Sequence, residues 1–320
     1  MSAPSVSIVV TARHDNYGGD VTERIIAPLQ FNVARLSEHR VAYEIVLVEW
    51  DPVPGRPYLS EVLAAQLPQL TKDAIRRIVV APEYQTALTQ SPRPFYLEYL
   101  AKNVGIRRAA APFVLVSNVD VLLGRAVVNA LAKGSLEPST IYRAPRYDTK
   151  LGLDQSGLSW DVLEDSANLA TCAVLRPPLF SHGAADFLLA DRETFHRLRG
   201  FNEVYRSARV GIDANFMAKA HGAGHPIKEI GGPVYHINHV GSYRLSRAAA
   251  DGADSSWGNT DWHARHVTYN NPDGWGLGNA PSRQLADGTT FLDFDWRAVP
   301  PLVELRRLTL PGRHAAEEPA

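Results

Sequence analysis

Short runs rich in Val and Ile recur along the first part of the chain and alternate with segments of helical spacing. The runs are Ser5–Ala12, Tyr43–Glu49, Ile75–Val80 and Phe113–Asn118. Strands separated by helical segments are typical of β-α-β units, in which a helix crosses over between two parallel strands. Because the runs are almost continuously apolar, we expect a sheet that is covered on both faces. The sequence therefore predicts an α/β fold with a mostly parallel, Rossmann-like sheet flanked by helices.

The second part of the chain is less regular. Helical spacing predicts helices at Thr22–Ser37, Phe95–Arg108, Arg192–Leu198 and Ile212–His221, whereas Leu151–His182 reads as irregular. After Ser246 the chain is rich in Gly, Asp, Asn and Trp and shows little periodicity. We therefore expect a catalytic domain over residues 1–245 and a loop-rich extension over residues 246–320 that packs on the same domain.

Composition excludes several classes of protein. A formal net charge of −1 over 320 residues argues against non-specific binding to nucleic acid, which needs a basic surface. The single cysteine, Cys172, rules out an intrachain disulfide and a Cys-based zinc site. No apolar run approaches the roughly 18 residues of an integral membrane segment, and the first residues lack a basic signal region. We therefore expect a cytoplasmic protein.

Polar side chains follow the predicted strands at the points where the strands end. They are Thr11, Arg13, His14 and Asp15 at the end of the first run, Glu49 and Asp51 at the end of the second, and Asn118 and Asp120 at the end of the fourth. In an open parallel sheet, ligands bind at the carboxyl ends of the strands. Acidic residues gathered there can bind ribose hydroxyls and a divalent cation through oxygen atoms. The alternative is that each acidic side chain only caps a turn.

Four segments resemble the GT-A glycosyltransferases, in particular the family-2-like group and the galactosyltransferase C-terminal type. The resemblance covers roughly residues 5–240. Its segments are Ile8–Arg13, Ala101–Arg108 followed by Pro112–Asp120, Phe187–Phe195 through Gly200–Glu203, and Gly211–Asp213. The first resembles the nucleotide-contacting strand and loop, and the second resembles the R-N-x-G and D-x-D block. The third and fourth resemble the R-x-x-F-x-x-x-G-G-F-x-E element and the family's acidic pair.

The resemblance implies a nucleotide diphosphate sugar as donor, with UDP as the expected nucleotide, and Mn²⁺ or Mg²⁺ as cofactor. It places Lys102, Asn103, Asn118 and Asp120 in the donor site, with Arg107 as a further candidate near the diphosphate. Two positions depart from the pattern. Asn118 stands where the D-x-D motif has its first carboxylate, and Ile212 stands where the acidic pair has its Glu. Asp120 is then the expected carboxylate ligand of the metal.

Two histidines near a short strand are candidates for the remaining metal ligands. In Tyr235–His239, strand alternation places the side chains of Tyr235 and His236 on opposite faces. His239 comes at the end of the strand near a glycine turn, which makes it the first candidate, with His236 second. Either histidine is also compatible with a purely structural role.

Two further acidic residues are assigned roles by position and resemblance. Asp213 is the candidate general base, which must remove a proton from the acceptor hydroxyl; its alternative role is to cap a helix over Ala214–Ala220. Asp186 precedes an apolar strand and is a candidate for binding the hydroxyls of the donor sugar. Trp275, in a glycine-rich segment, suggests a loop that closes over the bound donor.

These observations predict a metal-assisted glycosyltransferase of the hexosyltransferase type that moves a sugar to an acceptor hydroxyl, carbohydrate or other, with inversion as the expected outcome. Two alternatives stay open. A sugar-1-phosphate nucleotidyltransferase shares a nucleotide-binding α/β sheet, but it should have a Gly-rich loop after the first strand. A catalytically inactive relative that binds nucleotide sugars or glycans would explain Asn118 and Ile212. The absence of G-x-x-x-x-G-K-[ST], G-x-G-x-x-G and G-x-S-x-G motifs argues against P-loop, dinucleotide-binding and α/β-hydrolase chemistry.

Overall fold

The strands of the computed structural model form two sheets. The structure describes residues 3–15, 21–67, 69–89, 96–173, 175–181, 183–204, 206, 211–239 and 270–300. The strands are β1 (Val6–Ala12), β2 (Tyr43–Trp50), β3 (Ile75–Val80), β4 (Phe113–Ser117), β5 (Val121–Leu123), β6 (Ile141–Arg143), β7 (Arg146–Thr149), β8 (Leu169–Ala173), β9 (Phe187–Asp191), β10 (Ile227–Glu229), β11 (Val234–His236), β12 (Ser282–Gln284) and β13 (Thr290–Leu292).

The larger sheet has the strand order β10-β6-β9-β4-β1-β2-β3-β13-β12. Its centre is parallel, because β4, β1, β2, β3 and β13 all run in the same direction. Strand β9 lies antiparallel between β4 and β6. The smaller sheet has the order β5-β11-β7-β8. The prediction of an α/β fold with a mostly parallel sheet is confirmed.

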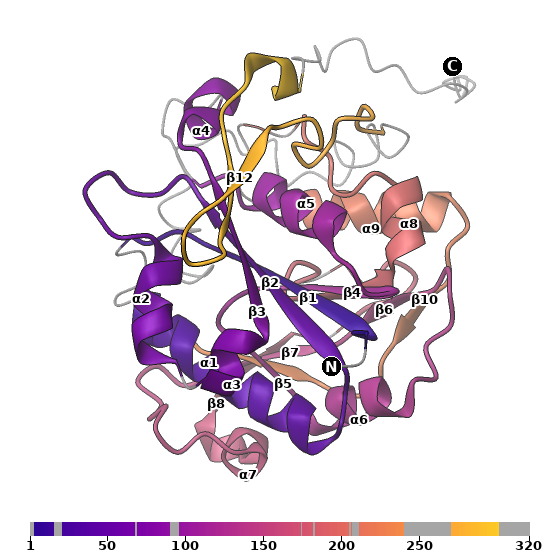
Figure 1. Ribbon diagram of the computed structural model, residues 1–320. Coiled ribbons are helices and arrows are strands. Elements are labelled where there is room, and N and C mark those ends of the chain that lie inside the picture. Colours follow the sequence, from indigo (N-terminus) through magenta and orange to yellow (C-terminus); the bar gives the residue numbers. More distant parts are fainter. Residues whose placement is uncertain are drawn as a thin grey trace, which may run out of the picture.

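Helices cover both faces of the larger sheet (Figure 1). They are α1 (Val21–Glu38), α2 (Leu59–Gln66), α3 (Gln69–Asp73), α4 (Glu83–Leu88), α5 (Glu98–Arg108), α6 (Arg125–Lys133), α7 (Trp160–Glu164), α8 (Arg192–Arg197) and α9 (Ile212–Gly222). One apolar core lies on the side of α5, α8 and α9, and the other lies on the side of α1, α2, α6 and the smaller sheet. Strand β1 contributes side chains to both cores, since Val9 belongs to the first and its neighbours Ile8 and Val10 belong to the second.

Gly105 lets α5 pack closely on the sheet. A Cβ atom at this position would lie 2.4 Å from Cγ1 of Val9 and 3.2 Å from Cγ2 of Val48. Such distances leave no room for a methyl group, so the glycine sets how closely α5 approaches β1 and β2. This helix carries Lys102 and Asn103, whose positions therefore depend on the same contact.

The predicted strands agree with β1 to β4 to within one residue at each end. The irregular reading of Leu151–His182 is wrong in part, because this segment contains α7 and β8. Strand β8 has only five residues (LATCA), most of them small, and lies at the edge of the smaller sheet, so it lacks the Val- and Ile-rich pattern of a buried strand. Helix α5 begins at Glu98, whereas residues 91–95, which include the predicted start, lie outside the described residues.

The extension predicted after Ser246 is described only from residue 270 to residue 300. Here β13 adds to the larger sheet beside β3, with Phe291 opposite Val79. This part of the chain therefore shares a sheet with the residues before 245. Among the described helices, none has both the length and the apolar character needed to cross a membrane.

Candidate active site at the carboxyl edge of the sheet

The register of β4 and β9 brings Asn118 and Asp186 together. The two strands are antiparallel and pair Ser117 with Phe187, so the residue after β4 faces the residue before β9. The amide of Asn118 donates from Nδ2 to Oδ1 of Asp186 at 2.7 Å. Both residues stand at the carboxyl end of β4, the edge at which an open parallel sheet binds its ligands.

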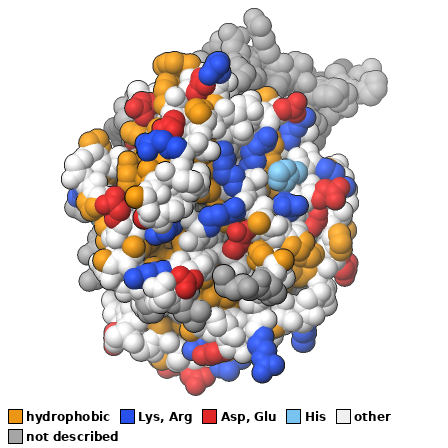
Figure 2. Space-filling view, viewed as in Figure 1, with side chains coloured by type: hydrophobic (Ala, Val, Ile, Leu, Met, Phe, Trp, Pro, Cys, Tyr) orange, Lys and Arg blue, Asp and Glu red, His pale blue; other side chains and the backbone are white. Residues whose placement is uncertain are grey.

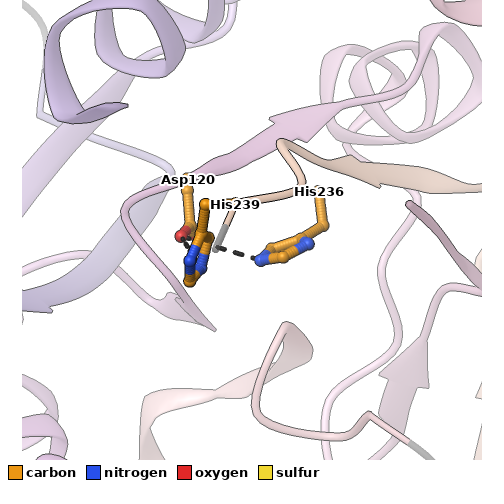
Figure 3. Close-up of side chains that lie close together, drawn as sticks. All are labelled: Asp120, His236 and His239. Carbon is orange, nitrogen blue, oxygen red and sulfur yellow. Dashed lines mark ion pairs between the residues drawn. The ribbon is translucent and has the colours of Figure 1, made fainter. Parts of the chain in front are cut away.

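The smaller sheet delivers two histidines to Asp120. Strand β11 runs antiparallel to β5 and pairs His236 with Val121, and the backbone N–H of Ile237 donates to the carbonyl of Asp120 at 2.9 Å. Oδ2 of Asp120 lies 3.6 Å from Nε2 of His236 and 3.5 Å from Nε2 of His239. All three side chains are buried and turn toward one another (Figure 3). The structure thus brings together the three metal ligands predicted from the sequence.

Asp148 orients His236 from the other side. Strand β7 runs parallel to β11 and pairs Asp148 with His236, and Nδ1 of His236 lies 3.0 Å from Oδ1 of Asp148. A carboxylate on one ring nitrogen fixes the tautomer and presents the other nitrogen to a ligand. Burial lowers the pKa of His236, but the charge of Asp120 and the hydrogen bonds to Asp120 and Asp148 more than offset burial and raise the pKa to about 9.

Asp120 is held in its ionised form. Burial alone would raise the pKa of its carboxyl group. The nearby imidazoles of His236 and His239 outweigh burial and hold that pKa well below its usual range. Arg24, in the first part of α1, also donates from Nη1 to Oδ2 of Asp120 at 2.9 Å. The Asp120 carboxylate therefore stays ionised although it is buried.

The donor atoms of Asp120, His236 and His239 fit a divalent transition metal. One ligand atom from each residue can be chosen such that all three lie within 4.8 Å of one another. A carboxylate oxygen with two imidazole nitrogens suits Mn²⁺ or Zn²⁺ better than Mg²⁺, which prefers oxygen ligands. Three ligands from the protein leave coordination positions open for a substrate.

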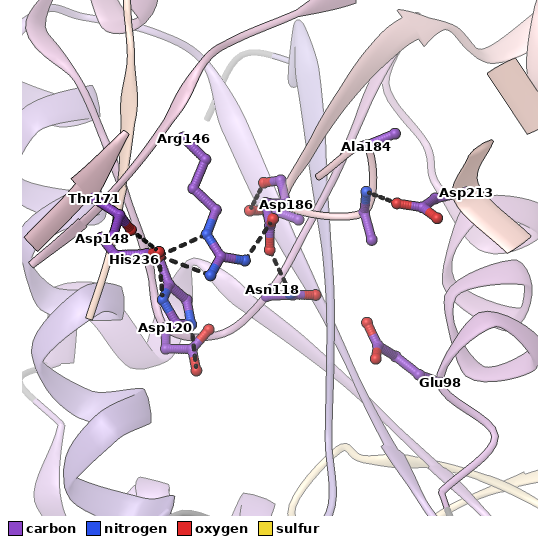
Figure 4. A network of polar contacts seen from close by, with 12 residues as sticks. Glu98, Asn118, Asp120, Arg146, Asp148, Thr171, Ala184, Asp186, Asp213 and His236 are labelled. Atoms are coloured by element: carbon purple, nitrogen blue, oxygen red, sulfur yellow. Dashed lines mark hydrogen bonds and ion pairs between the residues drawn. The ribbon is translucent and has the colours of Figure 1, made fainter. Parts of the chain in front are cut away.

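A chain of polar contacts runs from this cluster to Asp186 (Figure 4). Arg146 donates from Nη1 to Oδ2 of Asp186 at 2.8 Å and from Nε to Oδ1 of Asp148 at 2.7 Å. Asp148 also accepts from the hydroxyl of Thr171 at 2.6 Å. Asp186 is thus held by Asn118 on one oxygen and by Arg146 on the other, so its carboxylate has a fixed orientation.

Lys102 acts on the site through Asn118. Its ammonium group is fully buried and donates to Oδ1 of Asn118 at 2.6 Å, to Oε1 of Glu98 at 2.5 Å and to the carbonyl of Ala185 at 3.1 Å. Because these contacts occupy the ammonium group, the structure places Lys102 behind Asn118 rather than beside a donor. The lysine fixes which end of the amide faces Asp186.

Asp213 lies at the start of α9 on the far side of Asp186 from the histidines (Figure 4). Its Oδ2 accepts from the backbone N–H of Ala185 at 3.1 Å, and its Oδ1 accepts from that of Ala214 at 2.9 Å. Burial raises the pKa of Asp213, while these two hydrogen bonds oppose the rise. The capping alternative is wrong in its detail, since Gly211 occupies the cap position and Asp213 lies inside the first turn.

The ends of β1 and β2 form the other side of the edge. Thr11 and Glu49 are buried, whereas Arg13 and Asp15 are partly exposed. Arg13 lies 3.9 Å from Asp15 and pairs with Oδ2 of Asp51 at 2.9 Å. The carboxyl group of Glu49 accepts from the N–H of Leu59 at 2.7 Å, and burial raises its pKa to about 7.

Three other predicted contributors lie away from the edge. Asn103 is fully buried and binds the backbone of Phe201 and the carboxylate of Glu203, so its part in donor binding stays a prediction. Arg107 lies at the last turn of α5, over the ring of Trp275, next to the amino end of β4. Trp275 is itself buried in the core, which is incompatible with the predicted closing loop.

Basic side chains gather on the face over α5 and α8, as the space-filling view shows (Figure 2). Arg108 donates to the carbonyls of Gly276 and Leu277 at 2.8 Å each, and Arg192 donates to the carbonyls of Ala109 and Ala110 at 3.4 and 3.3 Å. Arg108 thereby holds the segment around Trp275 on α5, whereas Arg192 binds the residues that follow α5.

Sequence reasoning missed Arg24, Arg146 and Asp148. Asp148 and Arg146 reach the site through the pairing of β7 with β11, which no local pattern indicates. Arg24 carried a weak signal. A cation in the first turns of a helix is unfavourable beside the positive end of the helix dipole, so it suggests a tertiary anionic partner. That partner is Asp120.

Comparisons with known proteins give matches only among solved structures. No family model matches the chain, and no curated protein matches it. The catalytic domain of Drosophila beta1,4galactosyltransferase 7, in complex with xylobiose, matches at 13% identity and a TM-score of 0.38, over 92% of this chain and 97% of that one. A structure of GalNAc-T7 with UDP, GalNAc and Mn²⁺ matches at 12% identity and a TM-score of 0.47.

The second match covers 74% of this chain, and this chain spans 44% of the length of GalNAc-T7. Both matched structures are glycosyltransferases, the class that the sequence resembles. Because both TM-scores lie below 0.5, the function is inferred from the residues of the site.

Proposed function

We propose that this protein is a metal-assisted glycosyltransferase that moves a sugar from a nucleotide diphosphate to a hydroxyl group of an acceptor. The observation that carries the proposal is the convergence of Asp120, His236 and His239 beside Asp186 at the carboxyl edge of the sheet. A cation site next to a fixed carboxylate suits a ligand that has a diphosphate at one end and sugar hydroxyls at the other.

The metal end supplies charge neutralisation. Breaking the bond between the sugar carbon and the diphosphate oxygen leaves both bonding electrons on that oxygen. A divalent cation held by Asp120, His236 and His239 would stabilise the charge that develops on the leaving diphosphate. Asp148 supports this role by fixing His236 with Nε2 directed at Asp120.

The sugar end is supplied by Asp186 and Asn118. Asp186 is buried and held through both of its oxygens, so it presents its remaining lone pairs in one orientation. A carboxylate placed in this way accepts hydrogen bonds from sugar hydroxyls. Its position between the metal cluster and Asp213 is where the transferred sugar would lie.

Asp213 is the proposed general base. It takes the proton of the acceptor hydroxyl as that oxygen attacks the sugar carbon from the side opposite the diphosphate, which inverts the configuration. A carboxyl group whose pKa is raised by burial is a stronger base than an exposed one. Thr11, Arg13, Asp15 and Glu49 are left for the nucleoside, with UDP as the proposed nucleotide.

The replacement of Asp213 by Asn tests this assignment. Nucleotide sugars are first screened with Mn²⁺ for those that stabilise the protein, and transfer to a panel of hydroxyl acceptors is followed by mass spectrometry. The Asp213→Asn variant should lose transfer by a factor of roughly 10² to 10⁴ and keep its affinity for the donor. Asp154→Asn, in an exposed turn, is the control. Unchanged transfer in Asp213→Asn would remove this residue from the mechanism.

A further inference from the structure

Among the described residues, Arg24 is the cation closest to Asp120. Its Nη1 lies 2.9 Å from Oδ2 of Asp120, whereas the imidazole nitrogens of His236 and His239 lie 3.6 and 3.5 Å from that same oxygen. The side chains of Arg24 and Asp120 are each 9% exposed, so solvent screens this pair only weakly. The guanidinium group therefore binds the same Asp120 oxygen that lies nearest the two histidines.

The position of Arg24 is fixed by the helix that carries it. Two turns further along α1, Asn32 donates from Nδ2 to the carbonyl of Val121 and accepts from the N–H of Leu123, both at 2.8 Å. These two bonds attach α1 to β5, the strand that directly follows Asp120. Helix α1 and the metal ligand therefore keep one relative position.

A divalent cation and the guanidinium group compete for the negative charge at Oδ2. Carboxylate oxygens bind such ions at about 2.0–2.2 Å, well inside the hydrogen-bond distance that the arginine now uses. Two positive groups on one buried oxygen repel each other strongly unless an additional anion is present. The diphosphate of a donor is such an anion, and planar guanidinium groups bind phosphate oxygens well.

We propose that Arg24 is the resident counter-ion of Asp120 and that it exchanges this carboxylate for the diphosphate when metal and donor enter together. The inference rests on the proposed function. It makes the binding of metal and nucleoside diphosphate cooperative, because a metal ion on Asp120 displaces the guanidinium group and the diphosphate then binds both positive groups. Metal alone binds weakly, and each ligand raises the affinity for the other by the same factor.

The test is a titration of the full chain with Mn²⁺, in which free Mn²⁺ is followed by electron paramagnetic resonance, with and without UDP. In the unmodified protein, UDP should tighten Mn²⁺ binding at least tenfold. Arg24→Met removes the charge but keeps a long side chain. In this variant Mn²⁺ alone should bind at least tenfold more tightly, and the effect of UDP should shrink.

Two further variants serve as controls. Arg24→Lys keeps the positive charge and should keep weak binding of Mn²⁺ alone. Arg35→Met changes another arginine of α1, which pairs with Glu38 away from the site, and should behave like the unmodified protein. Thermal unfolding without ligands checks that each variant is folded, and Arg24→Gln replaces Arg24→Met if the latter is not.

The outcomes separate the inference from the proposed function. If the unmodified protein binds Mn²⁺ with UDP, but neutral variants at position 24 bind Mn²⁺ alone no more tightly than it does, Arg24 does not compete with the metal and the inference is wrong. If the unmodified protein binds neither Mn²⁺ nor UDP under any condition, the proposed function fails, and the inference fails with it.

Discussion

The amide of Asn118 donates to one oxygen of the Asp186 carboxylate over 2.7 Å, and its own oxygen accepts from Lys102 over 2.6 Å. Asn118, which departs from the D-x-D pattern, therefore uses both ends of its amide in hydrogen bonds to charged neighbours. A carboxylate at position 118 would have no N–H for Asp186 and would place two negative charges in contact. Asn118 in place of a carboxylate removes a potential metal ligand, but it fixes the orientation of Asp186.

An aspartate at position 118 should consequently lower the stability of the folded protein. In Asn118→Asp, repulsion between the two carboxylates should lower the free energy of unfolding by about 1–3 kcal/mol at pH 8. The loss should be smaller at pH 5, where one of the pair more readily takes up a proton. Denaturant unfolding at both pH values measures it, with the exposed Asn279→Asp as control. Equal stability of Asn118→Asp and the unmodified protein at pH 8 would mean that a carboxylate at position 118 does not repel Asp186.

The carboxylate of Asp148 should contribute to metal affinity without binding the metal. In Asp148→Asn, the group that fixes Nδ1 of His236 loses its charge, and affinity for Mn²⁺ in the presence of UDP should fall roughly 10- to 100-fold. Isothermal titration calorimetry measures the affinity, and Asp154→Asn is the control. An affinity for Mn²⁺ equal to that of the control would mean that Asp148 has no role in orienting His236.

Glu49 should make stability depend on pH. Burial raises its folded-state pKa to about 7 from an ordinary value of 4.5, so the folded protein binds this proton more tightly than the unfolded chain does. The associated stabilisation is complete below pH 4.5 and is lost as the pH rises through 7. Relative to the unmodified protein, Glu49→Gln should therefore gain up to about 3 kcal/mol between pH 4.5 and pH 8. Parallel stability curves for the two proteins over this range would show that Glu49 has no raised pKa.

Gly105 should not tolerate even a methyl group. Gly105→Ala places its Cβ 2.4 Å from Val9, and the resulting overpacking should lower the free energy of unfolding by about 1–3 kcal/mol despite the better helix propensity of Ala. Gly157→Ala is the control, because a Cβ atom there meets no atom within 4 Å. Denaturant unfolding compares the two variants. An unchanged or increased stability of Gly105→Ala would mean that α5 can move away from the sheet at no cost.

The central sheet could be predicted from the sequence because its strands are buried on both faces. Burial requires nearly continuous apolar residues in β1 to β4, and this pattern is visible without a structure. The short strands β7 and β8 are half exposed or lie at an edge, and their residues carry no comparable pattern. The position of β13 in the larger sheet depends on pairing with β3 across a long sequence separation, which periodicity does not encode.

The candidate site could be predicted only as far as its residues follow strands. Asp120, His236 and Asp186 end or precede strands, and the sheet edge brings them to one place. The roles of Lys102 and Asn103 were not predictable, because a polar residue on a buried helix face looks the same whether it meets a ligand or another side chain. Arg24 and Asp148 belong to elements whose tertiary neighbours decide their function. The cytoplasmic location and the general-base role of Asp213 stay predictions.

Thermal unfolding of the unmodified protein with UDP, Mn²⁺, or both tests directly whether the site binds a metal-bound nucleoside diphosphate. A ligand that binds only the folded state raises the apparent melting temperature according to its concentration and affinity. UDP and Mn²⁺ together should raise the melting temperature by more than the sum of their separate effects, and this excess should disappear in Asp120→Asn. If no combination of UDP and Mn²⁺ changes the melting temperature of the unmodified protein, the site does not bind a metal-bound nucleoside diphosphate and the proposed function is wrong.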